Sequence, residues 1–208
     1  MASPCDASSP SCSSQRRCSR RPRRTPPPKR VLVDATPDVR LYQAGRSYTV
    51  TAPAAHRSFD LGSLIPRGRR NESVIHDVVL AGRFVAFAIG ADSADSRSDR
   101  VYVRDVKAGR FVARAVAPVV AEPGIEPGDS REARALALAP TGAVAWLASY
   151  TNAPNTAVRT QVVALPRGGA PSLLDGAPAG GGIDGTVLAA HDGRLFWLHD
   201  GAPRSAVL

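Results

Sequence analysis

Cysteine is scarce in this 208-residue chain, and the three present, Cys5, Cys12 and Cys18, all lie near its start. They are separated by six and then five residues, with no CxxC pair and no nearby histidine, which disfavours a zinc site. Their odd number leaves one thiol unpaired in any disulfide scheme, so their role stays open. Because no cysteine follows residue 18, we expect a body that is held together without disulfides.

Long apolar runs and helical periodicity are also missing. No stretch approaches 18 uninterrupted apolar residues, which excludes a predicted transmembrane helix. No long segment keeps a 3.6-residue period, and 18 glycines and 18 prolines interrupt the chain. No apolar segment follows the N-terminal charges, so no signal peptide is predicted in this reading frame. The chain is expected to be all-β, and its compartment stays unknown.

The common catalytic and nucleotide-binding motifs are absent as well. The sequence contains no G-x-S-x-G, GxxxxGK[ST], G-x-G-x-x-G or HExxH. The glycine run 180–182 is expected to precede a strand, whereas a phosphate cradle needs a helix to begin there. We therefore assign no catalytic, cofactor-binding or metal-binding residue and predict that the protein is not an enzyme.

The positive charge is concentrated at the N-terminus. Residues 1–30 hold eight basic side chains and one acid, Asp6, which leaves 19 basic and 17 acidic side chains in residues 31–208. Segment 1–30, rich in Ser, Pro and Arg, has too little apolar content to fold and is predicted to be disordered. It could bind an anionic polymer or lipid through its arginines. No aromatic residues interleave to stack bases, so nucleic acid is not the favoured partner.

The clearest pattern in the body of the chain lies at residues 77–116. Apolar runs alternate there with a Gly turn, a polar loop and a Lys-Ala-Gly-Arg turn, which predicts a four-stranded antiparallel meander. Residues 84–89 are apolar at every position, as in a strand covered on both faces. Residues 100–104 alternate, with Val101 and Val103 on one face, as in a half-exposed strand.

Parts of this unit recur at 135–176 and 186–208. In each copy a strand meets a Gly turn at Gly82, Gly142 or Gly193, and a second strand carries a large aromatic residue. These aromatic residues are Phe87, Trp146 and Trp197, which we expect to be buried in a shared interior. Repeat units stack because one sheet cannot bury its own face. Hairpins of an ordinary β-sandwich are the alternative explanation.

Two groups of polar residues are candidate functional sites. Three histidines precede aspartates, in His76-Asp77, His191-Asp192 and His199-Asp200, and we expect structural roles because Asp-Gly follows in two of the pairs, as in hairpin turns. The carboxylates of Asp92, Asp95 and Asp99 lie close in sequence, but their spacing does not match a calcium-binding EF-hand loop.

The units LAGRFVAFA, LAPTGAVAWLASY and VLAAHDGRLFWLHDGAPRSAVL resemble degenerate blades of WD-repeat or TolB-type β-propellers. They are most similar to small uncharacterised actinobacterial proteins with the same rhythm. The resemblance covers about residues 31–208 and implies a binding or scaffold surface, and also export. A closed propeller takes four or more blades of about 40–45 residues, so the length allows barely four.

We therefore expect one all-β domain over residues 31–208, built of four-stranded meanders in a small or incomplete propeller-like array. Its expected function is non-catalytic binding of a protein or cell-envelope ligand through loops such as 90–99 and 149–159. Two alternatives stay open. One is a propeller-type glycan lyase or hydrolase that uses the carboxylates of 92–99 together with His76 or His191. The other is binding of an anionic polymer by the basic tail. The ligand, the oligomeric state and closure into a ring cannot be inferred.

Overall fold

The computed structural model describes residues 28–63, 73–92, 97–117, 130–152, 156–178 and 181–208. This part of the chain forms fifteen β-strands, one 3₁₀ turn at Pro53–Ala55 and no α-helix, which confirms the all-β prediction. Within the described ranges, no helix is long and apolar enough to cross a membrane. Of the predicted disordered tail, residues 1–27 lie outside the described residues, and β1 begins at Arg30.

Consecutive strands pair antiparallel and form four meanders, named I to IV in chain order. Meander I consists of β1 (Arg30–Ala35), β2 (Arg40–Ala44), β3 (Ser47–Ala52) and β4 (Arg57–Ser63). Meander II consists of β5 (Ser73–Ala81), β6 (Phe84–Asp92), β7 (Arg97–Asp105) and β8 (Arg110–Val116). Meander III consists of β9 (Ser130–Leu138), β10 (Val144–Asn152), β11 (Thr156–Leu165) and β12 (Ser172–Pro178). Meander IV has three strands, β13 (Ile183–His191), β14 (Arg194–His199) and β15 (Ala202–Val207).

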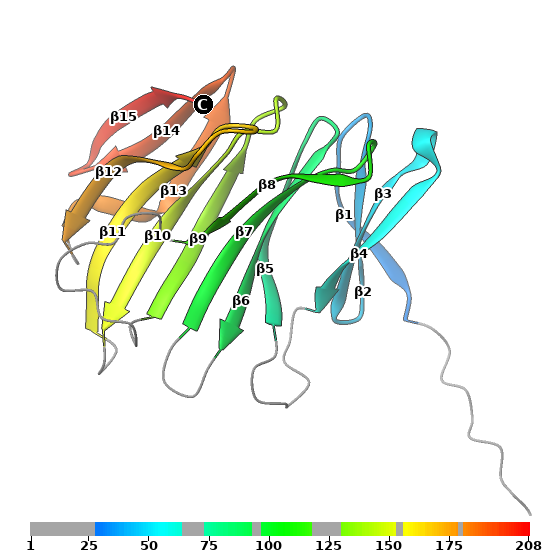
Figure 1. Ribbon diagram of the computed structural model, residues 1–208, viewed down its shortest axis with the longest axis horizontal. Coiled ribbons are helices and arrows are strands. Elements are labelled where there is room, and N and C mark those ends of the chain that lie inside the picture. Colours follow the sequence, from blue (N-terminus) through cyan, green and yellow to red (C-terminus); the bar gives the residue numbers. More distant parts are fainter. Residues whose placement is uncertain (1–27, 64–72, 93–96, 118–129, 153–155, 179–180) are drawn as a thin grey trace, which may run out of the picture.

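The meanders succeed one another across the molecule, from the blue and cyan strands of meander I to the orange and red strands of meander IV (Figure 1). Meanders II and III join into one eight-stranded sheet through β7 and β9, which run parallel and share the register pair Ser98 and Arg131. Over the described residues, the strand ladders do not close into a ring. This meander architecture is consistent with both the incomplete propeller-like array and the sandwich expected from the sequence.

Three apolar cores lie between successive meanders. The core between meanders I and II includes Leu41, Val50, Val85, Phe87 and Val106. The core between meanders II and III includes Phe84, Ala86, Val103, Trp146 and Val163. The core between meanders III and IV includes Leu147, Val162, Ala177, Leu195 and Trp197. Strand β6 contributes alternate residues to two of these cores, as its uninterrupted apolar sequence predicted.

The three aromatic residues of the repeat are buried, with exposed fractions of 3% for Phe87, 0% for Trp146 and 5% for Trp197. The expectation of a shared interior is wrong, because each ring belongs to a different core. Each ring nevertheless occupies the same place in its own unit, since it points toward the preceding meander. Large side chains therefore separate successive sheets at regular intervals.

The glycine turns of the repeat have the predicted conformation. Gly82, Gly142 and Gly193 have φ values of +52°, +90° and +72°, which favour glycine. The Thr36 hydroxyl donates to the carbonyl of Gly82, and a Cβ atom built at Gly82 would lie 3.7 Å from Pro140. The first hairpin turns of meanders I, II and III therefore lie side by side. We call the edge of the molecule that they form the turn edge.

Candidate functional site

His76 on β5 lies between two carboxylates. Its Nδ1 atom is 2.9 Å from Oδ2 of Asp77, and its Nε2 atom is 2.9 Å from Oδ2 of Asp99 on β7. The second contact joins the ring to a buried carboxylate, and both hydrogen bonding to Asp99 and its negative charge favour the protonated ring. Asp99 has no exposed surface, and the backbone N–H of Ala133 on β9 donates to its Oδ2 atom over 2.8 Å. The cluster therefore joins meander II to meander III.

The two carboxylates control the protonation of His76. Burial alone would lower the pKa of its imidazole, but the hydrogen bond to Asp77 and the contacts with Asp99 outweigh burial and raise the pKa from 6.5 to about 9. The ring is therefore positively charged at neutral pH. A cation held between two anions, one of them fully buried, is suited to a structural role in linking strands.

The lyase or hydrolase alternative would be favoured if the carboxylates of 92–99 met His76 or His191 at one rim within hydrogen-bond reach. Asp99 does meet His76, but its carboxylate has no surface that a substrate could reach. The side chains of Asp92 and Asp95 lie outside the described residues. His191 instead contacts its neighbour Asp192 over 3.2 Å, with both side chains largely exposed. Of the groups named for this alternative, the described residues bring together His76 and Asp99, as a pair whose carboxylate is buried.

A second polar cluster joins meanders III and IV. Oδ2 of Asp175 on β12 accepts from Nε1 of Trp197 over 2.7 Å and lies 2.8 Å from Nδ1 of His199. Its Oδ1 atom accepts the backbone N–H of Gly176. Partial burial would raise the pKa of Asp175, but these hydrogen bonds outweigh it and hold the pKa below its ordinary value. The carboxylate fixes the position of the buried indole ring.

The turn prediction for the remaining His-Asp pairs is confirmed. Asp192 and Asp200 have φ values of +46° and +53°, and the glycines after them have φ values of +72° and +70°. Two successive residues with positive φ make the type of tight turn that Asp-Gly favours in hairpins.

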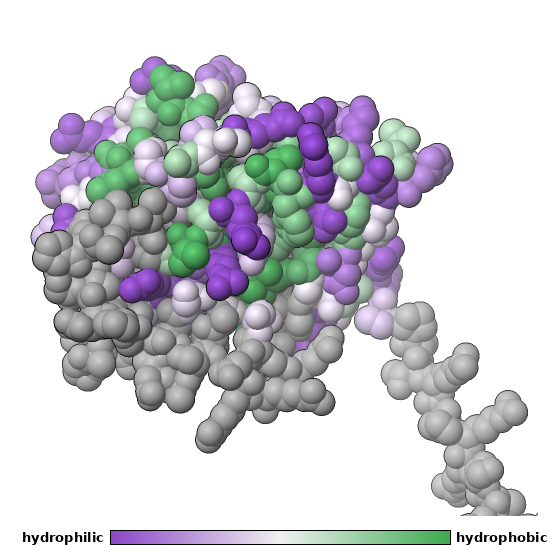
Figure 2. All heavy atoms as spheres, viewed as in Figure 1, coloured by the Kyte–Doolittle hydropathy of each residue, from purple (hydrophilic) through white to green (hydrophobic). Residues whose placement is uncertain are grey.

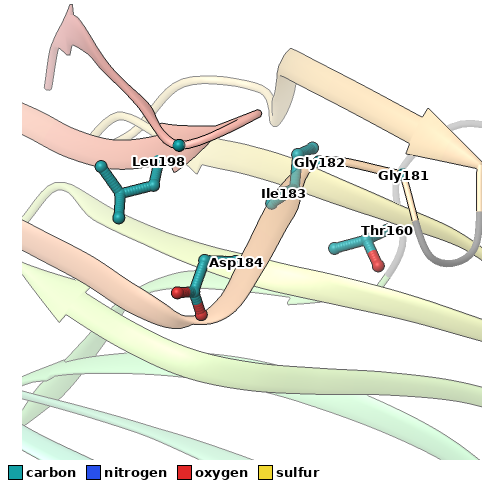
Figure 3. Close-up of a pocket in the computed structure, with 7 residues that line it drawn as sticks. Thr160, Gly181, Gly182, Ile183, Asp184 and Leu198 are labelled. Atoms are coloured by element: carbon teal, nitrogen blue, oxygen red, sulfur yellow. The ribbon is translucent and has the colours of Figure 1, made fainter.

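A cavity of about 380 Å³ lies beside meander IV. It is lined by Thr160, Leu198, Gly201 and the consecutive residues 181–184. Figure 3 shows the Thr160 and Asp184 side chains well apart, with the backbone of Gly182 and Ile183 between them. Because few polar side chains converge there, the cavity does not form a chemically defined site. Gly181 and Gly182 of the glycine run, which precede strand β13 as expected, thus contribute backbone to this cavity.

A second cavity, of about 460 Å³, lies between the turns of meanders II and III. It is lined by Arg110, Phe111, Val112, Arg167 and Gly168. Phe111 is 51% exposed and forms an apolar surface between the two arginines. This combination of cations and an open aromatic ring suits a ligand that carries negative charge on a partly apolar framework.

Two arginines flank the ring of Phe84 next to this cavity. The guanidinium carbon atoms of Arg83 and Arg167 lie 5.2 and 5.4 Å from the ring centroid. Nε of Arg83 is also 3.0 Å from Oδ2 of Asp105, a carboxylate that is 1% exposed. The ring of Phe84 thus attracts both guanidinium groups through its electron-rich faces.

Arg104 extends this arrangement to meander I. Its guanidinium carbon lies 3.8 Å from the centroid of Phe59 on β4 and 4.7 Å from that of Phe111. Burial lowers the pKa of Arg104 below its usual value. Arg57 donates to the carbonyl of Ala108 in the same region. Meanders I, II and III therefore all contribute arginines here.

We call this group the arginine rim: Arg57, Arg83, Arg104, Arg110 and Arg167. Its members lie at or next to the hairpin turns, on the turn edge. In Figure 2 hydrophilic and apolar residues alternate along the upper edge of the molecule, where these turns are drawn in Figure 1. Meanders I, II and III thus all place arginines on this edge.

The sequence analysis missed this rim, although a signal was present. The hexapeptide Ala-Gly-Arg-Phe-Val-Ala occurs twice, at residues 81–86 and 108–113. Each copy forms a hairpin turn followed by a strand, so each places one arginine and one phenylalanine at the turn edge. Phe84 is buried in a core and Phe111 is half exposed. The repeated hexapeptide thus builds both sides of the cationic cluster.

Within the described ranges, no group of three or more His, Cys, Asp or Glu side chains is arranged to hold a metal ion. No protein-family model, no curated protein and no solved structure gives a significant match to the chain.

Proposed function

We propose that this chain is a non-catalytic binding module of the β-propeller type, akin to WD-repeat or TolB-type proteins, and that it binds an acidic protein or an acidic cell-envelope ligand. Consecutive antiparallel meanders stacked through apolar cores support the propeller type. The loops expected to contact the ligand, 90–99 and 149–159, lie partly outside the described residues. The arginine rim provides the contact surface in this proposal.

One observation carries the proposal: aromatic rings lie against the guanidinium groups of three of the five rim arginines. Arg83 and Arg167 share the ring of Phe84, and Arg104 stacks between Phe59 and Phe111. Guanidinium groups bind carboxylates and phosphates through paired N–H donors. Side chains already held by stacking lose less conformational entropy on binding. Asp105, the carboxylate among them, is buried and paired with Arg83, so it neutralises only part of the charge.

The test compares two double variants of the full chain. Arg110→Glu with Arg167→Glu reverses two charges at the rim cavity. Arg114→Glu with Arg204→Glu makes the same net change at exposed positions on β8 and β15, away from that cavity. Binding is measured against poly(glycerol phosphate), polyglutamate and uncharged dextran by biolayer interferometry at two salt concentrations.

The rim variant is expected to bind an acidic polymer at least about tenfold more weakly than the wild type, equivalent to about 1.4 kcal/mol. The control variant should retain most of the affinity, and dextran should not bind. Equal losses in both variants would show that net charge, rather than the rim, is responsible. Failure of the wild-type chain to bind either acidic polymer would overturn the proposal. Poly(glycerol phosphate) represents the envelope ligand and polyglutamate represents the acidic protein. Comparing the two affinities therefore shows which class of ligand the chain prefers.

A further inference from the structure

Three of the four meanders bury an aromatic residue in the same way. In the register of each first and second strand, this residue lies opposite an aliphatic one. The pairs are Phe87 with Val78, Trp146 with Leu136 and Trp197 with Leu188. In each pair the two side chains face the preceding meander and belong to the core that it helps to form. The preceding sheet is thus the normal cover for this pair.

Meander I carries the same kind of pair, and none of the other three meanders, as far as they are described, covers it; the guanidinium carbon of Arg30 lies 6.0 Å from the centroid of the Tyr42 ring. Tyr42 on β2 lies opposite Leu32 on β1. The neighbouring Leu41 points into the core shared with meander II, so strand alternation directs Tyr42 to the other face. Leu32 is 52% exposed, and Tyr42 is only partly buried. This end of the array therefore presents the surface that a preceding meander covers elsewhere in the chain.

Meander IV presents the complementary uncovered face. Leu195 and Trp197 on β14 point toward meander III, so Phe196 between them points outward and is 39% exposed. Val187 on β13 and Val207 on β15 are 37% and 78% exposed, and their neighbours Leu188, Ala206 and Leu208 pack toward meander III. The Leu208 backbone N–H donates to the carbonyl of Gly193 within the same meander. The outward face of meander IV therefore exposes these apolar side chains beside Arg194 and Ser205, which hydrogen-bond to each other over 2.8 Å.

We infer that a second copy of this chain covers both ends, head to tail: meander IV of each copy packs on meander I of the other. The molecule already contains this type of interface three times. In each, the aromatic and aliphatic pair of one meander packs on the face of the preceding meander that is turned toward it. Such a contact joins two different surfaces, and two copies related by a twofold axis satisfy both. The resulting ring would hold eight meanders, within the four to eight blades usual for propellers.

The experiment measures the molar mass of the full chain by sedimentation equilibrium. The chain has a mass of 21.8 kDa, and a dimer of twice this mass is expected. Phe196→Glu and Leu32→Lys each place a charge on one end face, and each should give a monomer. Leu173→Glu on β12 is the matched control, because Leu173 is 39% exposed, like Phe196, but lies on meander III away from both end faces. This control should remain a dimer.

Mixing the two monomeric variants distinguishes a head-to-tail contact from a symmetric one. In a mixed dimer, one interface brings the introduced glutamate against the introduced lysine, and these charges attract each other. The other interface has the wild-type residues on both sides, so dimers should reappear. Circular dichroism confirms that each variant keeps its strands. A wild-type chain that is monomeric at every concentration would overturn the inference. So would a dimer that Leu32→Lys leaves intact, or an assembly that grows without limit.

Discussion

Nε2 of His76 lies 2.9 Å from Oδ2 of Asp99, a carboxylate that has no exposed surface. The same carboxylate oxygen accepts the backbone N–H of Ala133 from the next meander. The imidazole therefore neutralises a charge that the contact between two sheets has buried. Removing the proton from His76 would remove the positive charge of its ring from beside this buried carboxylate, which links the stability of the fold to pH.

Stability is expected to decrease as pH rises from about 6.5 to above 9. The pKa of His76 is about 9 in the folded chain and 6.5 for an ordinary histidine, so its contribution is fully present below pH 6.5 and is lost as pH rises through 9. The loss should be on the order of 2 kcal/mol, since one pKa unit corresponds to about 1.4 kcal/mol and the side chain retains some solvent contact. Urea unfolding from pH 6 to 10 measures it. His76→Gln should abolish most of this slope, and an unchanged slope in that variant would contradict the assignment.

Asp175→Ala is expected to destabilise the contact between meanders III and IV. The substitution leaves Nε1 of Trp197 without its acceptor, and a buried polar group without a partner costs about 1–3 kcal/mol. Urea unfolding followed by tryptophan fluorescence measures the loss. Asp184→Ala is the control, because the Asp184 carboxylate is exposed and bonds only to nearby Thr186 in the described contacts. Equal effects of the two substitutions would show that Asp175 has no special role.

Gly142→Ala should destabilise the fold more than Gly193→Ala. Both glycines have positive φ values, so an alanine at either position costs about 1–2 kcal/mol in backbone strain. A Cβ atom at Gly142 would also lie only 3.0 Å from the ring of Phe84, whereas nothing lies within 4 Å of one at Gly193. Thermal unfolding gives the melting temperature of each variant, and the difference between the two measures the cost of the contact with Phe84 at Gly142. Equal melting temperatures would show that the ring of Phe84 moves aside without penalty.

Deleting residues 1–27 tests the basic tail against the arginine rim. The deletion ends before β1, which begins at Arg30, and removes most of the N-terminal charge. If the rim is the binding surface, the shortened chain should bind poly(glycerol phosphate) within about threefold of the full chain, a change of less than 1 kcal/mol. Loss of binding to this polymer, to DNA and to acidic vesicles together would instead assign the function to the tail.

Local sequence signals predicted much of this fold. Glycine turns at Gly82, Gly142 and Gly193 marked hairpins because few other residues adopt positive φ there. The uninterrupted apolar run of β6 indicated a strand between two cores. These features depend on neighbouring residues, so they can be read without knowing how the sheets stack.

Features that depend on stacking could not be predicted in this way. Alternation made residues 100–104 look like a half-exposed strand, and Val101 and Val103 are indeed buried. The other face, however, packs Tyr102 against the core between meanders I and II and Arg104 between two aromatic rings. The burial of Asp99 likewise results from β9 of the next meander. Partners distant in sequence determine these environments, and no local pattern encodes them.

The single backbone pair between Ser98 and Arg131 has an evolutionary consequence. Over the described residues, the other ladder hydrogen bonds join strands of the same meander, and neighbouring meanders otherwise meet mainly through side chains. Recombination that duplicates or deletes a whole meander would therefore break few backbone hydrogen bonds. The new junction between meanders would resemble those already present.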